Sequence, residues 1–290
     1  FKQKTAYEIM PSLVGSEMCI RDRSINLGQG FPDDYGPNAV LQKASEYLFD
    51  LPNQYPPMLG VPELRQAVAA HNKRFYGLDI NWKTETMVSS GATEGLAACF
   101  LGLLNQGDEV VVIEPLYDCY LPMIERAGGI PKRVSIEPPD WKLNGSALRA
   151  AFSNKTKLVL INSPQNPSSK VYHREELLLI ADLVKEHDAI AICDEVYEHM
   201  VYDHRKHIPL MTLPGMRDRS IRIGSAGKTF SLTGWKVGYL TGSEELLKAV
   251  SKAHQFLVFT TPPNLQRAVA DGLNGDGTYC LLYTSPSPRD

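Results

Sequence analysis

The 290-residue sequence has the composition of an ordinary globular protein, with 43% hydrophobic and 22% charged residues. Its 30 Lys and Arg against 33 Asp and Glu give a net charge of −3, which argues against non-specific binding to nucleic acid. No apolar run reaches the length of a membrane-spanning helix. We therefore expect one large core, or a large domain and part of a second, with no nucleic-acid and no membrane partner.

The two ends of the chain differ in origin from the rest. One coding sequence for the tail "CLLYTSPSPRD" (280–290) has a reverse complement that encodes "LVGSEMCIRD" (13–22). Inverted sequencing adaptors at the ends of a DNA fragment produce such a relation, whereas two unrelated protein segments do not. We interpret 1–23 and 280–290 as adaptor-derived artefact without ordered structure, and 24–279 as the folded part, truncated at both ends.

The cysteines predict a reduced protein. Two of the five, Cys19 and Cys280, lie in the adaptor-like ends. Cys99, Cys119 and Cys193 stand in apolar or mixed contexts and do not have the spacing of metal ligands. This pattern favours a cytoplasmic protein without a metal site.

Short apolar runs alternate with amphipathic stretches along the chain. The runs "TMVSS", "DEVVVIEP", "TKLVLINSP", "AIAICDEVY" and "SIRIGS" predict strands, while "TEGLAACFLGLL" and "REELLLIADLVKEH" predict helices. This alternation predicts a three-layer α/β/α domain with a mostly parallel sheet. Ligands of such sheets bind beyond the carboxyl ends of the strands. The candidate site residues therefore follow the runs, at 90–93, 114–117, 162–166, 194–197 and 225–228.

Lys228 follows the run "SIRIGS" and allows two interpretations. A phosphate-binding P-loop requires G-x-x-x-x-G-K-[ST], but Arg222 stands at the first glycine position, and "FSLTGWKVG" predicts a turn and a further strand instead of a helix. The alternative is a lysine that forms a Schiff base with an aromatic aldehyde. Such a site needs a carboxylate, hydrogen-bond donors, an aromatic ring and an anion site, and the strand ends supply them with Asp194, Tyr197, Asn166, Tyr117 and the helix start "SSGAT". The sequence favours this second interpretation.

Five segments in order, "NLGQGFPD", "NQYPPMLGVPELRQAV", "IEPLYDCYLPM", "CDEVYEHMVYD" and "IGSAGKTFSLTGWKVG", resemble the class I/II aminotransferases. These are pyridoxal-phosphate (PLP) enzymes of fold type I. The resemblance covers 24–279 and is strongest to the group of kynurenine aminotransferases, glutamine transaminase K and cysteine-S-conjugate β-lyases. It implies a PLP-binding large domain, with the start of the small-domain segment at its N-terminus. The C-terminal small domain, with the arginine for the substrate carboxylate, and the N-terminal arm are expected to be missing, so that the fragment itself is expected to have an incomplete substrate site.

The resemblance also implies individual roles. Lys228 is the lysine that binds PLP as a Schiff base and moves the substrate α-proton, and Asp194 pairs with the pyridinium nitrogen. Tyr197 and Asn166 donate to the ring hydroxyl, and Tyr117 stacks on the ring. The implied phosphate ligands are Ala92, Thr93, Ser225, Lys236 and, from the neighbouring subunit of a homodimer, Tyr55. The implied substrate-binding residues are Gly30, Asn166 and, again from the neighbouring subunit, Phe259.

Simpler interpretations of the same residues remain open. Asp194 after a strand is also typical of a helix N-cap, and Tyr117 is equally typical of a core side chain. Asn166 is compatible with an ordinary Asn-Pro turn. Ser169 stands where the family has glycine, so a left-handed conformation there would cost energy and the turn is expected to differ.

The function implied is transamination between an amino acid and a 2-oxo acid. The expected pocket lining, Phe31, Tyr55, Tyr117 and Phe259, is aromatic, and no arginine of 24–279 stands in a motif for a second carboxylate. Burial of apolar surface then favours glutamine, methionine, aromatic amino acids and kynurenine over aspartate. Two alternatives are a cysteine-S-conjugate β-lyase and a PLP-sensing, non-catalytic domain of a transcription regulator.

Overall fold

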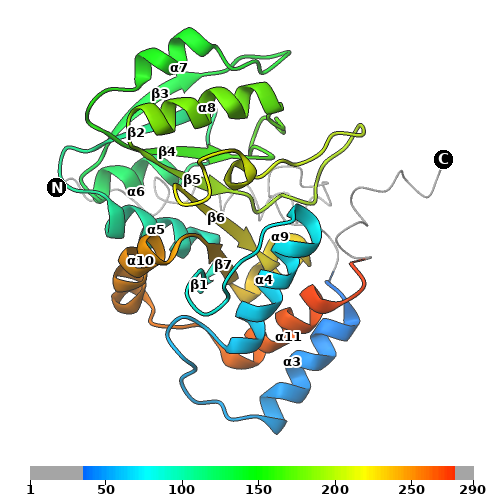
Figure 1. Ribbon diagram of the computed structural model, residues 1–290. Coiled ribbons are helices and arrows are strands. Elements are labelled where there is room, and N and C mark those ends of the chain that lie inside the picture. The colour runs from blue at the N-terminus through cyan, green and yellow to red at the C-terminus, as the bar shows by residue number, and fades with distance from the viewer. Residues whose placement is uncertain (1–34, 278–290) are drawn as a thin grey trace, which may run out of the picture. The chain divides into compact units, whose positions relative to one another are not determined.

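The computed structural model describes residues 35–277, which form a central sheet with helices on both faces (Figure 1). The adaptor-like ends and the stretch 24–34, with Gly30 and Phe31, lie outside the described residues. The strands are β1 (Thr86–Ser90), β2 (Glu109–Glu114), β3 (Ile130–Ser135), β4 (Thr156–Asn162), β5 (Ile190–Asp194), β6 (Ser220–Ser225) and β7 (Val237–Thr241). The helices are α3 (Asn38–Asp50), α4 (Pro62–Tyr76), α5 (Gly91–Leu103), α6 (Tyr120–Arg126), α7 (Gly145–Ala151), α8 (Arg174–Glu186), α9 (Ala226–Thr229), α10 (Glu244–Leu257) and α11 (Pro263–Asn274), with short 3-10 turns η1 (Leu210–Thr212) and η2 (Thr233–Trp235).

The sheet has the strand order β1-β7-β6-β5-β4-β2-β3. Every neighbouring pair is parallel except those that involve β7, which runs antiparallel to both β1 and β6. The prediction of a mostly parallel sheet is therefore confirmed. Because the other six strands share one direction, their carboxyl ends meet at one edge, and Asn162 of β4 is directly paired with Asp194 of β5.

Three clusters of buried side chains fill the space between the sheet and its helices. On one face, α5, α6 and α10 cover the sheet with a core that includes Phe100, Ile124 and Leu240. On the other face, α7 and α8 cover the half around β4, and α3, α4 and α11 cover the half around β7. The alternation of side chains along each strand sends neighbouring residues to opposite faces.

Helix α8 was predicted as an amphipathic cover helix, and the structure confirms it. Its buried residues recur at helical spacing and are Leu177, Ile180, Ala181, Leu183 and Val184. Glu176 in its first turn accepts the backbone N–H of His173 at 3.0 Å, which satisfies one donor at the helix start. Full burial of each large aliphatic side chain stabilises the fold by about 1.5–3 kcal/mol.

Strand β3 was not predicted. Its sequence "IPKRVS" contains Pro131 and two cations and leaves most residues partly or fully exposed. Among the strands of 35–277, it pairs with β2 alone and stands at an edge of the sheet, where proline and charged residues are tolerated. Within 35–277, no helix combines the length and apolar character needed to cross a membrane.

Candidate active site

Asn162 ties together the carboxyl ends of β4 and β5. Its Nδ2 donates to the backbone oxygen of Asp194 at 2.9 Å, and its Oδ1 accepts the backbone N–H of Asn166 at 2.7 Å. Asn162 is itself buried, so water does not compete for these bonds. Two residues with predicted roles, Asp194 and Asn166, are thus held at adjacent strand ends by a side chain to which the sequence assigned no role.

Asp194 is a buried carboxylate at the end of β5. The Tyr120 hydroxyl donates to its Oδ2 at 2.6 Å, and the Val196 backbone N–H donates to its Oδ1 at 3.3 Å. Burial raises the pKa of Asp194 to about 6, although these two donors and Lys228 oppose the rise. A hydrogen-bonded turn follows Asp194 instead of a helix, so the interpretation as a helix N-cap is wrong.

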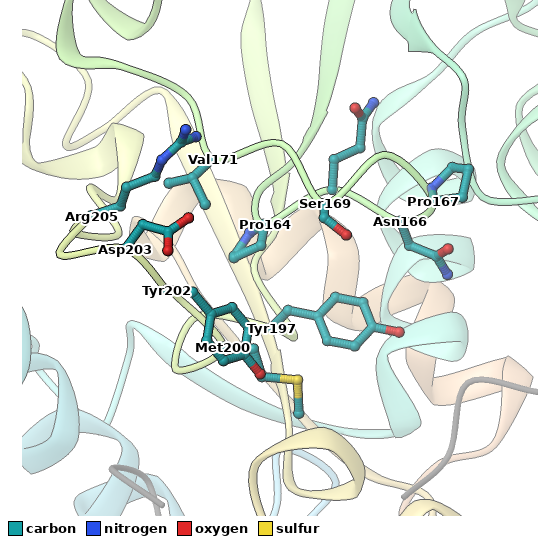
Figure 2. Close-up of a pocket in the computed structure, with 11 residues that line it drawn as sticks. Pro164, Asn166, Pro167, Ser169, Val171, Tyr197, Met200, Tyr202, Asp203 and Arg205 are labelled. Carbon is teal, nitrogen blue, oxygen red and sulfur yellow. The ribbon is translucent and has the colours of Figure 1, made fainter. Parts of the chain in front are cut away.

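Lys228 lies on α9, directly after β6, and its Nζ is 5.6 Å from the centroid of the Tyr197 ring. Burial lowers the pKa of Lys228, helped by Lys236 and opposed by Asp194. A lowered pKa makes the neutral, nucleophilic amine more abundant at neutral pH. Burial raises the pKa of Tyr197, while a side-chain hydrogen bond with Asn166 opposes the rise. The Tyr197 and Asn166 side chains lie side by side at the pocket in Figure 2.

The start of α5 and Lys236 together form a positively polarised corner. Gly91 has φ +72°, and a Cβ built on it would lie 3.2 Å from Lys236 Nζ. The predicted anion ligands Ala92 and Thr93 are in the first turn of this helix, which has no side-chain cap bond. Backbone N–H groups at a helix start, next to an ammonium group, attract an anion such as a phosphate.

Tyr117 follows β2 near this group of residues. It is 39% exposed and stands edge-on to the Tyr120 ring, with 5.7 Å between the centroids. Burial raises its pKa, with smaller contributions from Cys119, Asp118 and Asp194, so the phenol lies within electrostatic range of Asp194. The exposed fraction argues against the interpretation as a core side chain.

Tyr55 and Phe259 contact each other, with ring centroids 5.7 Å apart and an interplanar angle of 87°. We call these two residues the rim pair. Tyr55 is 84% and Phe259 is 37% exposed. Within 35–277, no ring contact joins either of them to Lys228, Asp194 or Tyr197.

Comparison with known proteins agrees with this geometry. The family model "Aminotransferase class I and II" matches residues 22–280. A probable N-succinyldiaminopimelate aminotransferase of Mycobacterium tuberculosis is 42% identical over 91% of this chain and 67% of its own length. Kynurenine–oxoglutarate transaminase 1 of Homo sapiens is 41% identical over 91% of this chain, which spans 65% of that relative. The structure of a methionine aminotransferase from Escherichia coli superposes with a TM-score of 0.90 at 35% identity, covering 93% of this chain and 71% of that one.

The chain belongs to the class I and II aminotransferases. The resemblance stated from the motifs is therefore confirmed, and kynurenine transaminases are among the relatives. The fold matches solved aminotransferases as predicted, and the chain spans about two thirds of the curated relatives named here (67% and 65%).

The residues of this aminotransferase fit PLP. The pyridine nitrogen of PLP needs a carboxylate that is shielded from water, and Asp194 is buried at the edge where the strands end. A phosphate needs donors and positive charge, which the α5 start and Lys236 supply. An aldehyde needs a primary amine of lowered pKa, which Lys228 supplies. Ser225 Oγ accepts the Gly227 backbone N–H at 3.2 Å, which leaves its own hydroxyl hydrogen to donate.

A pocket of about 450 Å³ opens beside Asn166 and Tyr197 (Figure 2). Its lining differs from the expected set of Phe31, Tyr55, Tyr117 and Phe259; it consists of Pro164, Gln165, Asn166, Pro167, Ser169, Val171, Tyr197, Met200, Tyr202, Asp203 and Arg205. The aminotransferase therefore places one arginine and one aspartate at this pocket, neither of which follows a predicted strand directly. Only the tertiary fold of the loop after Met200 brings them there.

Ser169 adopts a left-handed backbone conformation, which costs energy for a residue with a side chain. Its φ is +59°, and its backbone N–H donates to the Gln165 oxygen at 2.7 Å. That this turn differs from the turn of the family stays a prediction.

Proposed function

We propose that this aminotransferase binds PLP at the strand edge formed by β4, β5 and β6, with Lys228 as the lysine that bonds to it. The observation that carries the proposal is the buried Asp194 on the same edge as the Lys228 amine, whose charges interact. The reaction is amino transfer between an amino acid and a 2-oxo acid, as the names of the relatives indicate for those proteins.

Each residue has a separate task in this proposal. When bound, PLP supplies an aldehyde carbon that joins amines and a ring that withdraws electrons from the substrate Cα. Lys228 Nζ takes the proton from the substrate Cα and returns it, and burial, which lowers its pKa, favours the neutral amine that this transfer needs. Asp194 holds negative charge next to the ring nitrogen. Tyr197 and Asn166 orient the ring hydroxyl, and Asn166 also contacts the substrate carboxylate.

The remaining residues bind and orient. Lys236, Ser225 and the α5 residues Ala92 and Thr93 hold the phosphate, and Tyr117 covers the ring face. Gly30, which lies outside the described residues, is proposed beside the substrate carboxylate. Lys236 acts as a point charge, since a lysine cannot form the two parallel bonds of an arginine.

We also propose a cytoplasmic homodimer in which the rim pair reaches the partner's site. Tyr55 and Phe259 contact each other and are 84% and 37% exposed, so they offer an aromatic surface that a second subunit can cover. The three cysteines among the described residues are free, in keeping with a reducing compartment.

The proposed amino donors are glutamine, methionine, aromatic amino acids and kynurenine. Pro164, Val171, Met200 and Tyr202 give the pocket apolar surface that a long side chain can bury. The proposed preference over aspartate rests on this apolar surface, which a short side chain buries less well; Arg205 and Asp203 line the same pocket with opposite charges.

The test uses the complete protein that contains this chain. Borohydride reduction with PLP should attach the cofactor to Lys228, and peptide mapping locates the label. Lys228→Ala should lose the label and lower kcat by about 10²–10⁴-fold. Lys248→Ala, at an exposed position of α10, should leave both unchanged. A label on another lysine would contradict the site. Aspartate as the best donor by tenfold in kcat/KM, about 1.4 kcal/mol, would contradict the donor assignment.

A further inference from the structure

The turn that carries Asp194 and Tyr197 has a second, charged side. Residues 194–198, called here the 194–198 turn, close with a bond from the Glu198 backbone N–H to the Glu195 oxygen at 2.9 Å. The Asp194 side chain contacts Tyr120 of α6, which packs on one face of the sheet. The Glu195 and Glu198 side chains contact Arg222 of β6 on the opposite face, close to α4.

Arg222 uses all of its nitrogen atoms in this contact. Its Nε donates to Glu195 Oε2 at 2.6 Å and its Nη2 donates to Glu198 Oε2 at 2.9 Å. Its Nη1 donates to Asn72 Oδ1, and the guanidinium lies over the Tyr76 ring, 4.5 Å from the centroid. The three charged side chains are nearly inaccessible to water, so the forked geometry is held firmly.

The surroundings of this cluster complete its hydrogen bonding. The Tyr76 hydroxyl donates to Glu198 Oε2 at 2.5 Å, and His207 Nε2 is 2.9 Å from Glu195 Oε2. His71, Glu198 and His199 bring ligand atoms within 4.8 Å of one another, as a metal site would. The Arg222 guanidinium already neutralises the carboxylate of that set, and a divalent cation beside it would be repelled.

Glu195 directly follows Asp194 in the sequence, and Glu198 directly follows Tyr197. Both glutamates are buried, and the Arg222 guanidinium binds both of them. A buried charge without a partner costs several kcal/mol, so the cation holds the two acids to one geometry. Because Glu195 and Glu198 alternate with Asp194 and Tyr197 along one turn, fixing the acids fixes the direction of the other two side chains. Arg222 also stands on β6, the strand that leads to Ser225 and Lys228.

We infer that Arg222 is a positioning residue of the active site: it clamps Glu195 and Glu198 so that Asp194 and Tyr197 face the cofactor, and its charge offsets that of Glu195 next to Asp194. This inference rests on the proposed roles of Asp194 and Tyr197. Arg222 touches neither cofactor nor substrate in it. The sequence offered Arg222 only as the residue that rules out a P-loop.

The electrostatic part of the inference has a defined sign. Glu195 raises the pKa of Asp194, which burial has already raised to about 6. Removing the Arg222 cation takes the positive charge out of this cluster; while Glu195, which His207 Nε2 still contacts at 2.9 Å, stays ionised, the pKa of Asp194 rises further and its ionised form predominates only at higher pH. Removing the Glu195 charge lowers the pKa of Asp194. The other ionisable groups that interact with Asp194 are Tyr117, Cys119, Tyr120, Cys193, Tyr197 and Lys228, and both changes leave them in place.

The experiment compares four variants of the complete protein: Arg222→Met, Arg222→Lys, Glu195→Gln and the control Arg219→Met. Arg219 stands just before β6 and pairs with the exposed Asp188 at 2.5 Å. The first readout is the carboxyl titration of Asp194 in the apoprotein by ¹³C NMR, with Asp194→Asn to assign the signal. We expect a shift of about one pH unit upward in Arg222→Met and a downward shift in Glu195→Gln. Arg219→Met should titrate like the parent.

The second readout is the PLP affinity, which separates the effect of the Arg222 hydrogen-bond geometry from the effect of its positive charge. Arg222→Lys keeps the cation and loses the fork, so its Asp194 titration should stay near the parent while PLP affinity falls about tenfold. Equal titrations in all variants would overturn the inference, as would unchanged PLP affinity in Arg222→Lys. If Arg222→Met does not fold, the result for Arg222→Lys, a parent-like Asp194 titration together with weaker PLP binding, still decides. Failure of the parent to bind PLP at Lys228 would instead contradict the proposed function, since the apoprotein titration does not depend on it.

Discussion

The 194–198 turn and the rim pair are both proposed parts of the active site, yet they differ in where their contacts come from. The turn receives partners from several parts of the same chain, among them Asn162 of β4, Tyr120 of α6, Arg222 of β6 and Tyr76 of α4. The rim pair is a T-shaped contact of two rings, and Tyr55 leaves 84% of its surface exposed.

This difference separates two kinds of functional residue. Buried polar groups must be satisfied within the fold, because an unpaired one costs about 1–3 kcal/mol, so their positions are set by the chain itself. Exposed aromatic residues bury little apolar surface within their own chain, so they contribute little to its folding free energy. They contribute when a second surface covers them, which here is the proposed partner subunit.

Breaking the turn should have the larger effect. Tyr120→Phe removes a donor from the buried Asp194 carboxylate, which we expect to cost about 1.5–3 kcal/mol of stability. The pKa of Asp194, about 6 in the parent, should rise, because the hydroxyl lowers it. The ionised form of Asp194 predominates only above this pKa. When the pKa rises, the acid limb of the kcat/KM profile should therefore move to higher pH.

Tyr172→Phe is the matched control for this prediction. Among residues 35–277, the buried Tyr172 hydroxyl has no hydrogen-bond partner, so its removal leaves no carboxylate of this part of the chain unsatisfied. Thermal unfolding and pH profiles of both variants provide the comparison. An equal loss of stability and an equal pH profile in the two would show that the Tyr120–Asp194 bond has no special role.

Breaking the rim pair should have a smaller effect, and on association instead of folding. Phe259→Ala removes the proposed aromatic contact with the partner subunit, worth about 0.5–1.5 kcal/mol, so the dimer should dissociate more readily; the contact with Tyr55 inside the chain is largely exposed, so the unfolding temperature should change little. Sedimentation velocity over a concentration series measures the dimer dissociation constant. Leu178→Ala, at an exposed leucine of α8, should leave it unchanged. Equal association in the two variants would remove the rim pair from the interface.

A third change sharpens the comparison at the pocket edge, where the backbone is strained and the side chain is exposed. Ser169→Gly relieves the left-handed conformation at φ +59° and should stabilise the protein by about 1 kcal/mol, with activity retained. Ser168→Gly is the control, because Ser168 donates its hydroxyl to Gln165 Oε1 and its loss should destabilise. Denaturant unfolding gives both values; a destabilised Ser169→Gly would mean that the Ser169 side chain itself matters.

Much of the fold was predictable from local pattern. Each of the five predicted runs contains a strand, because buried parallel strands need continuous apolar sequence; these strands end at Ser90, Glu114, Asn162, Asp194 and Ser225. Strand β3 escaped prediction because an edge strand can be polar and contain proline. The proposed roles of Lys228, Asp194, Tyr197 and Asn166 came from their position after strands and from family motifs.

The sequence by itself determined the layered α/β architecture, the family and the strand edge at which the candidate residues gather, since these depend on periodicity and on short motifs. The tertiary structure alone decided that Tyr120 bonds to Asp194, that Arg222 binds Glu195 and Glu198, and that Arg205 reaches the pocket. These contacts join residues on different elements, up to 74 positions apart in the case of Tyr120 and Asp194. No local pattern encodes such pairings, because the energy of a buried hydrogen bond or ion pair depends on which side chains the packed sheet and helices bring together.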